Sequence, residues 1–192
     1  MLDFAITLSF FISIIAFFGL FLLFADSLLL RFDLKTFLKA LGFAMLSAAA
    51  FFNFLSHGYI PITLWVYVIS FLFILFGFVF DPNSKLQLMA PLGAVAIFLL
   101  PGHLRLVILC VGIAGSIFQL IHSTKHQDLI PLGISFVLIA IGEYFYYVGQ
   151  MDSMHTLAPA GAFLYIFASI LLLFWLWSYV ALRVLLMVKN NS

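Results

Sequence analysis

Residues 133–149 read GISFVLIAIGEYFYYVG, an almost unbroken apolar run that contains one carboxylate. About 20 consecutive apolar residues are enough to cross the hydrocarbon core of a bilayer as a helix. Runs of this kind recur along the whole chain, which is 66% hydrophobic and only 8% charged. Soluble domains carry charged residues at about a quarter of their positions. The sequence therefore predicts an all-α integral membrane protein whose solvent is the lipid bilayer.

Seven apolar runs can be read as membrane-spanning helices. We expect them at roughly 4–30, 36–56, 60–80, 86–101, 104–124, 129–149 and 158–187. The run at 86–101 is the shortest and contains Pro91. The connections between the runs are short. We therefore predict that residues 1–192 form a single polytopic membrane domain, a seven-transmembrane helix bundle.

The basic residues are distributed unequally between the two sides of this bundle. If seven helices span the membrane, all the Lys and Arg residues but one lie on the same side, and Arg105 lies on the other. The residues of the basic side are Arg31, Lys35, Lys39, Lys85, Lys125, Arg183 and Lys189. Cytoplasmic loops of membrane proteins are enriched in Lys and Arg. The bias predicts an outer N-terminus and a cytoplasmic C-terminus, in the inner or plasma membrane of the cell.

Glu143 is the clearest candidate for a functional residue. It lies in the outer half of the sixth predicted helix, and Tyr146 and Tyr147 follow on the same helical face. Intramembrane carboxylates are rare, usually face the protein interior and often mark a binding site or a proton path. We expect Glu143 to face the bundle and to bond to Asn53 or His57 of the second helix. These five residues form a candidate ligand-binding site, and the alternative is that Glu143 only ties helices together.

The fifth predicted helix has a polar face. Its members follow one another at helical spacing: Gly112, Gly115, Ser116, Gln119, His122, Ser123 and His126. Small residues let a second helix approach, and Gln119 can form a hydrogen bond across such a contact. Gln119 therefore joins the candidate ligand-binding residues, with a helix-packing seam as the alternative. His122 and His126 are interpreted as solvated histidines, because no HExxH motif accompanies them.

Three further histidines fall in or beside the predicted outer connections. His57, His103 and His155 come from three separate loops, and Asp152 lies on the same side. Such a set would suit zinc or copper if the loops converge. It would also suit a pH sensor, because histidine titrates near neutrality. The remaining interpretation is that these are ordinary loop residues.

The net charge, the predicted layout and the residue pattern of the chain bear on several classes of function. The net charge of +1 gives the chain no general nucleic-acid-binding character. Receptors and microbial rhodopsins share the predicted layout, but fold does not imply function. A retinal Schiff base is not expected, because the span 158–187 contains no lysine. A membrane enzyme ranks low, because no complete set of histidines and carboxylates lies at one depth.

We predict a non-enzymatic, sensor-like membrane protein that binds a small ligand or ion from the outer side, or relays such binding to a membrane or cytoplasmic protein partner. The alternatives are a small proton- or ion-coupled carrier and a structural subunit of a larger membrane complex.

Overall fold

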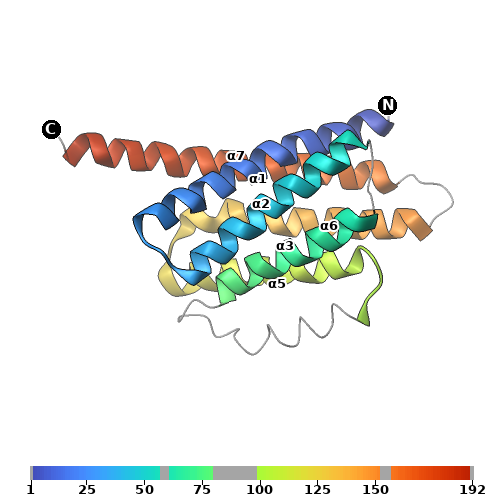
Figure 1. Ribbon diagram of the computed structural model, residues 1–192, viewed down its shortest axis with the longest axis horizontal. Coiled ribbons are helices and arrows are strands. Elements are labelled where there is room, and N and C mark those ends of the chain that lie inside the picture. The colour runs from blue at the N-terminus through green and yellow to red at the C-terminus, as the bar shows by residue number, and fades with distance from the viewer. Residues whose placement is uncertain (1, 57–60, 80–98, 152–156, 191–192) are drawn as a thin grey trace.

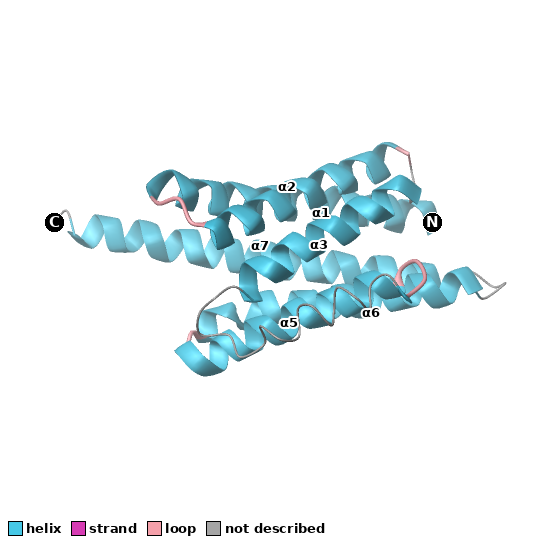
Figure 2. Ribbon diagram, turned by 60° about the horizontal axis from the view of Figure 1, so that its bottom comes forward, coloured by secondary structure: helices cyan, strands magenta, loops and turns pink. Residues whose placement is uncertain are grey.

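The computed structural model describes residues 2–56, 61–79, 99–151 and 157–190. Six long α-helices account for nearly all of them (Figure 1): α1 (Leu2–Leu30), α2 (Leu34–Leu55), α3 (Pro61–Val79), α5 (Leu104–Thr124), α6 (Ile130–Met151) and α7 (Leu157–Asn190). A short 3-10 helix, η2 (Gln127–Leu129), precedes α6. No strand occurs in the described ranges (Figure 2). Each of the six helices is long and apolar enough to cross a membrane, which supports an all-helical, multi-pass membrane protein.

The helices agree with six of the predicted spans to within a few residues. α2 begins at Leu34, two residues earlier than expected, after Asp33 in extended conformation (φ −140°, ψ 129°). α7 continues to Asn190, three residues beyond the expected end. The predicted span 86–101 lies almost wholly outside the described residues.

Four pairs of helices that are neighbours in the chain pack in antiparallel fashion. In the pair α2 and α3, Thr63 donates a hydrogen bond to Asn53 near the end of α2. Near the middle of the same pair, Gly42 lies against Ile74. Residue numbers thus fall along α2 as they rise along α3. Three further pairs are also antiparallel: α1 with α2, α5 with α6, and α6 with α7 (Figure 1).

α3 and α5 run in the same direction. The guanidinium carbon of Arg105 lies 4.5 Å from the ring centroid of Trp65. Farther along both helices, Gly112 lies against Leu75. Because residue numbers rise together in both helices, α3 ends at the opposite end of the bundle from the start of α5.

α1 and α7 are also parallel neighbours. The hydroxyl oxygens of Ser13 and Ser169 are 2.9 Å apart. Arg183 donates to Asp26 at 2.6 Å, thirteen residues further along α1. The two helices therefore stay in register over much of their length. α1 begins and α7 ends at opposite ends of the bundle (Figure 1).

Aromatic side chains fill the bundle interior and also cover its surface. The ring of Phe43 is fully buried and lies 5.6 Å from that of Phe24 and 6.5 Å from that of Phe136, measured between centroids. Phe167 and Phe174 are each 60% exposed on α7. A surface with this composition suits hydrocarbon rather than water.

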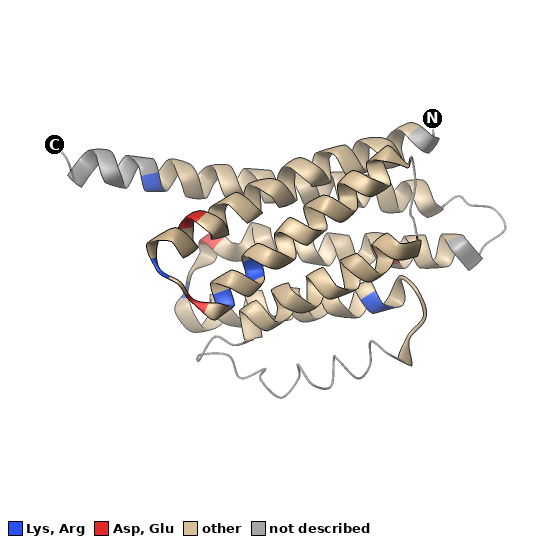
Figure 3. Ribbon diagram, in the orientation of Figure 1, with Lys and Arg blue, Asp and Glu red and all other residues tan. Residues whose placement is uncertain are grey.

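The described charged residues gather mainly at one end of the bundle (Figure 3). We call this the basic end, where α1 ends and α2 begins. It holds Arg31, Lys35, Lys39, Lys125, Arg183, Asp26, Asp33 and Asp128. Arg105 lies at the other end, beside the start of α5, and we call this the Arg105 end.

Candidate functional site

Glu143 of α6 is completely buried near the Arg105 end. Its Oε2 atom lies 2.5 Å from Nδ1 of His103, and its Oε1 atom accepts a hydrogen bond from the hydroxyl of Tyr165. The carboxyl group thus joins the turn before α5, the second half of α6 and the first half of α7. An intramembrane carboxyl group without such partners would be costly, so these contacts are what make its burial tolerable.

A tight turn places His103 beside the carboxyl group. Gly102 has a φ of 44°, in the left-handed region that favours glycine. The N–H of Leu104 then bonds to the carbonyl of Pro101 at 3.2 Å, which begins α5. His103 precedes the first residue of the helix and is buried against α6.

Two glycines place Tyr165 on the other side of the carboxyl group. An added Cβ at Gly142 would lie 3.2 Å from the carbonyl oxygen of Gly161. An added Cβ at Gly161 would lie 2.9 Å from the carbonyl oxygen of Gly142. The backbones of α6 and α7 therefore approach closely at this crossing. Tyr165 follows Gly161 by one turn, and Glu143 follows Gly142 directly.

Tyr146 packs between the two partners of Glu143. Its ring stacks on that of His103 with centroids 5.9 Å apart, and contacts the ring of Tyr165 at 6.1 Å. The ring of Tyr146 therefore packs against both side chains that contact the carboxyl group.

A second set of polar side chains lies between α2 and α3. The hydroxyl of Thr63 donates to Oδ1 of Asn53 at 2.6 Å. Tyr67 is buried one turn after Thr63 on α3. All six described helices, or the turns that begin them, thus contribute buried polar side chains to the same end of the bundle. We call these side chains the polar cluster: Ser9, Asn53, Thr63, Tyr67, His103, Glu143, Tyr146 and Tyr165.

Glu143 faces the bundle, as the sequence predicts. Among the described residues, His103 and Tyr165 contact its carboxyl oxygens, and neither was among the expected partners, Asn53 and His57. Asn53 accepts a hydrogen bond from Thr63 and belongs to the same cluster. His57 lies outside the described residues. The observed partners of Glu143 come from α7 and the start of α5 because α6 packs mainly between these two helices. The position of a residue on its own helix does not reveal which helices lie beside it.

The other candidate ligand residues fall in different surroundings. Tyr147 is only partly buried, whereas its neighbour Tyr146 is buried. Gln119 lies sixteen residues after His103 in the same helix, about 24 Å along its axis. Its buried Oε1 atom has no hydrogen-bond partner among the described residues. Gln119 is thus too far along α5 to share a ligand with Glu143.

The proposed outer metal site can be followed only in part. His103 bonds to Glu143, while His57 and His155 lie outside the described residues. Within the described ranges, no group of three or more His, Cys, Asp or Glu residues could hold a metal ion. His126 is exposed at the basic end and lies 3.6 Å from Asp128.

Tyr165 was not identified from the sequence. Gly161, one turn earlier, is the signal that could have indicated Tyr165. Two helices approach closely at glycine residues, so a polar side chain one turn away can reach the neighbouring helix. From the sequence, His103 was a candidate metal ligand or pH sensor together with His57 and His155, and its contact with Glu143 was not predicted.

Comparison of the chain with protein-family models, with curated proteins and with solved structures finds no match in any of the three. The functional inference therefore depends on the geometry of the polar cluster.

Proposed function

We propose that this is a non-enzymatic membrane protein that binds a proton at Glu143 and His103 and converts the change of charge into a change of helix packing. The observation that carries the proposal is the buried carboxyl group, with each oxygen in contact with a side chain near the start of a different helix. A proton can bind directly to these two side chains, whereas a larger ion would need a cavity between them.

The proton count of the pair determines its net charge. With one dissociable proton, Glu143 and His103 together are neutral, whichever of them carries it. Loss of that proton leaves a negative charge inside the bundle, and gain of a second leaves a positive charge. An uncompensated charge in a low-dielectric interior is disfavoured by several kcal/mol. The neutral pair is therefore the stable packed form.

A change in proton count would act directly on three helices. His103 bonds to Glu143 from the start of α5, and Tyr165 bonds to it from α7. A charged pair favours entry of water and separation of these contacts. A membrane or cytoplasmic partner could then sense how α5 and α7 are positioned relative to each other and to α6.

We further propose seven spans, with the N-terminus outside and the C-terminus in the cytoplasm. The collection of described cations at the basic end supports the orientation. The parallel directions of α3 and α5 support one further crossing between them. Reporter fusions after Arg31 and after Lys125 should both report the cytoplasm, and reporters on opposite sides would contradict this topology.

Infrared difference spectroscopy across a pH titration tests proton binding. Wild-type protein should show a carboxyl band that changes with pH and is absent from Glu143→Gln. The matched control is Asp128→Asn, which removes a carboxylate that is half exposed at the basic end. That control should keep the band. A spectrum that Glu143→Gln leaves unchanged would mean that Glu143 is a structural tie and not a proton site.

Distance measurement tests the conversion to helix packing. Spin labels at Ile108 of α5 and Phe163 of α7 would face lipid, because both side chains are exposed, whereas the native Cys110 is buried. The separation of the labels should change with pH in the otherwise wild-type protein and stay constant in Glu143→Gln. A separation that follows pH equally in both proteins would contradict the proposal.

A further inference from the structure

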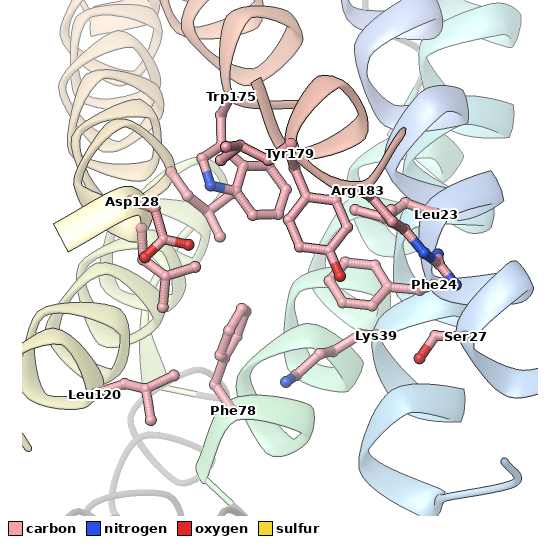
Figure 4. Close-up of a pocket in the computed structure, with 13 residues that line it drawn as sticks. Leu23, Phe24, Ser27, Lys39, Phe78, Leu120, Asp128, Trp175, Tyr179 and Arg183 are labelled. Atoms are coloured by element: carbon pink, nitrogen blue, oxygen red, sulfur yellow. The ribbon is translucent and has the colours of Figure 1, made fainter. Parts of the chain in front are cut away.

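A cavity of about 520 Å³ lies at the basic end, far from the polar cluster (Figure 4). Every long helix of the described bundle contributes to its wall, and η2 does so through Asp128. The wall is mostly apolar and aromatic, with Phe24, Phe78 and Trp175 among its members. Polar groups are few, so each of them has a strong influence on what the cavity can bind.

Lys39 of α2 places a cation in this wall. The stem of the lysine passes over Gly77 of α3, where an added Cβ would lie 2.6 Å from its Cγ atom. Its ammonium nitrogen lies 4.2 Å from the ring centroid of Phe78 and 5.9 Å from that of Phe24. Glycine at position 77 and the two rings therefore hold the cation at the cavity (Figure 4).

Arg183 of α7 supplies a second cation. One of its five N–H donors is used by Asp26 at 2.6 Å. The hydroxyls of Ser27 and Tyr179 also line the cavity.

An apolar groove of about 470 Å³ adjoins the cavity between α1 and α7. Leu23 and Arg183 line both spaces, so the groove continues from the cationic site. The rest of its wall is formed by Gly19, Leu22, Leu176 and Val180, with Asp26 beside Arg183. A hydrocarbon chain fits such a wall, and a fully hydrated ion gains nothing from it.

We propose that the cavity binds the phosphate group of an anionic phospholipid, with one acyl chain lying in the groove between α1 and α7. Basic pockets between transmembrane helices are known to recognise anionic headgroups. Two cations, Lys39 and Arg183, line this cavity together with the carboxylate of Asp128, whose side chain is 52% exposed. Asp26 in the wall of the groove takes one donor of Arg183, and Lys39 lies against two aromatic rings. The apolar groove favours a lipid over a soluble phosphate, because only the lipid supplies a chain to fill it.

Native mass spectrometry of delipidated protein tests the site. Phosphatidylglycerol should bind more tightly than phosphatidylcholine with the same acyl chains. Lys39→Met and Arg183→Gln should each weaken phosphatidylglycerol binding by about fivefold, which corresponds to about 1 kcal/mol per basic residue. Phosphatidylcholine binding should not change. Lys39→Arg keeps the cation and should retain the preference, which separates loss of charge from a fault in folding.

The control is Lys125→Gln, which removes an equal charge from the same end. Lys125 is exposed and does not line the cavity, so this variant should bind phosphatidylglycerol as the wild type does. Equal binding of the two lipids, or an equal loss in Lys125→Gln and Lys39→Met, would overturn the site. Binding of glycerol 3-phosphate as tight as that of phosphatidylglycerol would overturn the role of the acyl chain.

Discussion

Replacing Gly161 with alanine should force α7 away from α6 at the crossing beside Glu143. The added methyl group would lie 2.9 Å from the carbonyl oxygen of Gly142 and 3.3 Å from ring atoms of Tyr146. A comfortable carbon–oxygen contact begins at about 3.3 Å, so the backbones would have to separate by about 0.4 Å. Neither backbone can swing aside as a flexible side chain does. The strain therefore falls on the contact between Tyr165 and Glu143, one turn away.

The loss of stability in Gly161→Ala can be measured against Gly115→Ala as a matched control. Gly115 lies on α5 with nothing within 4 Å of an added Cβ. Alanine at either position gains about 0.5–1 kcal/mol from helix preference. Only Gly161→Ala also incurs overpacking, which destabilises by about 1–3 kcal/mol. Because the helix gain is common to both, the two variants should differ by about 1–3 kcal/mol in the free energy of unfolding.

Reversible unfolding in mixed micelles, followed by circular dichroism, measures this difference. Gly115→Ala should be as stable as the wild type or slightly more stable, and Gly161→Ala should be less stable than Gly115→Ala. Gly161→Ala should also alter the pH-dependent carboxyl band assigned to Glu143. The reasoning is refuted if Gly161→Ala equals or exceeds Gly115→Ala in stability.

Three further predictions concern single contacts, each measured by the same unfolding assay. Tyr165→Phe removes only the hydroxyl that bonds to Glu143 and should destabilise by about 1–2 kcal/mol; no loss would mean that the carboxyl group finds another donor. Ser169→Ala breaks the hydroxyl contact between α1 and α7 and should lower stability by about 0.6 kcal/mol, and a change above about 2 kcal/mol would indicate a wider network. Asp26→Asn removes the ion pair with Arg183, in which the Arg183 side chain is 34% exposed and the Asp26 side chain 55% exposed, so stability should change by less than about 1 kcal/mol.

The positions of the helices could be predicted because the membrane leaves few alternatives. A backbone in hydrocarbon must satisfy its own hydrogen bonds, so each long apolar run becomes a helix. Which face of a helix is buried could not be predicted in the same way. Phe17 is fully buried and Phe18 is 49% exposed, although the two are adjacent and identical. Lipid and protein interior both accept phenylalanine, so the apolar pattern does not distinguish them.

The candidate site shows the same limit. Glu143 could be predicted to face the bundle, because a carboxyl group is costly against lipid. Its partners could not, because helical spacing relates a residue to its own helix and not to the neighbouring ones. The contact with Tyr165 depends on the glycine crossing of α6 and α7, and the contact with His103 depends on the turn at Gly102.

The parallel pairing of α1 with α7 has a consequence for biosynthesis. Ser13 and Ser169 meet in the folded bundle, yet they are 156 residues apart in the chain. At a translation rate of about 5–20 residues per second, the ribosome needs roughly 8–30 s to synthesise the second partner after the first. Throughout this interval the face of α1 that will receive α7 is available to lipid, to an insertase or to a chaperone. The last helix therefore closes the bundle, and a nascent chain halted before α7 leaves the first helix open on that face.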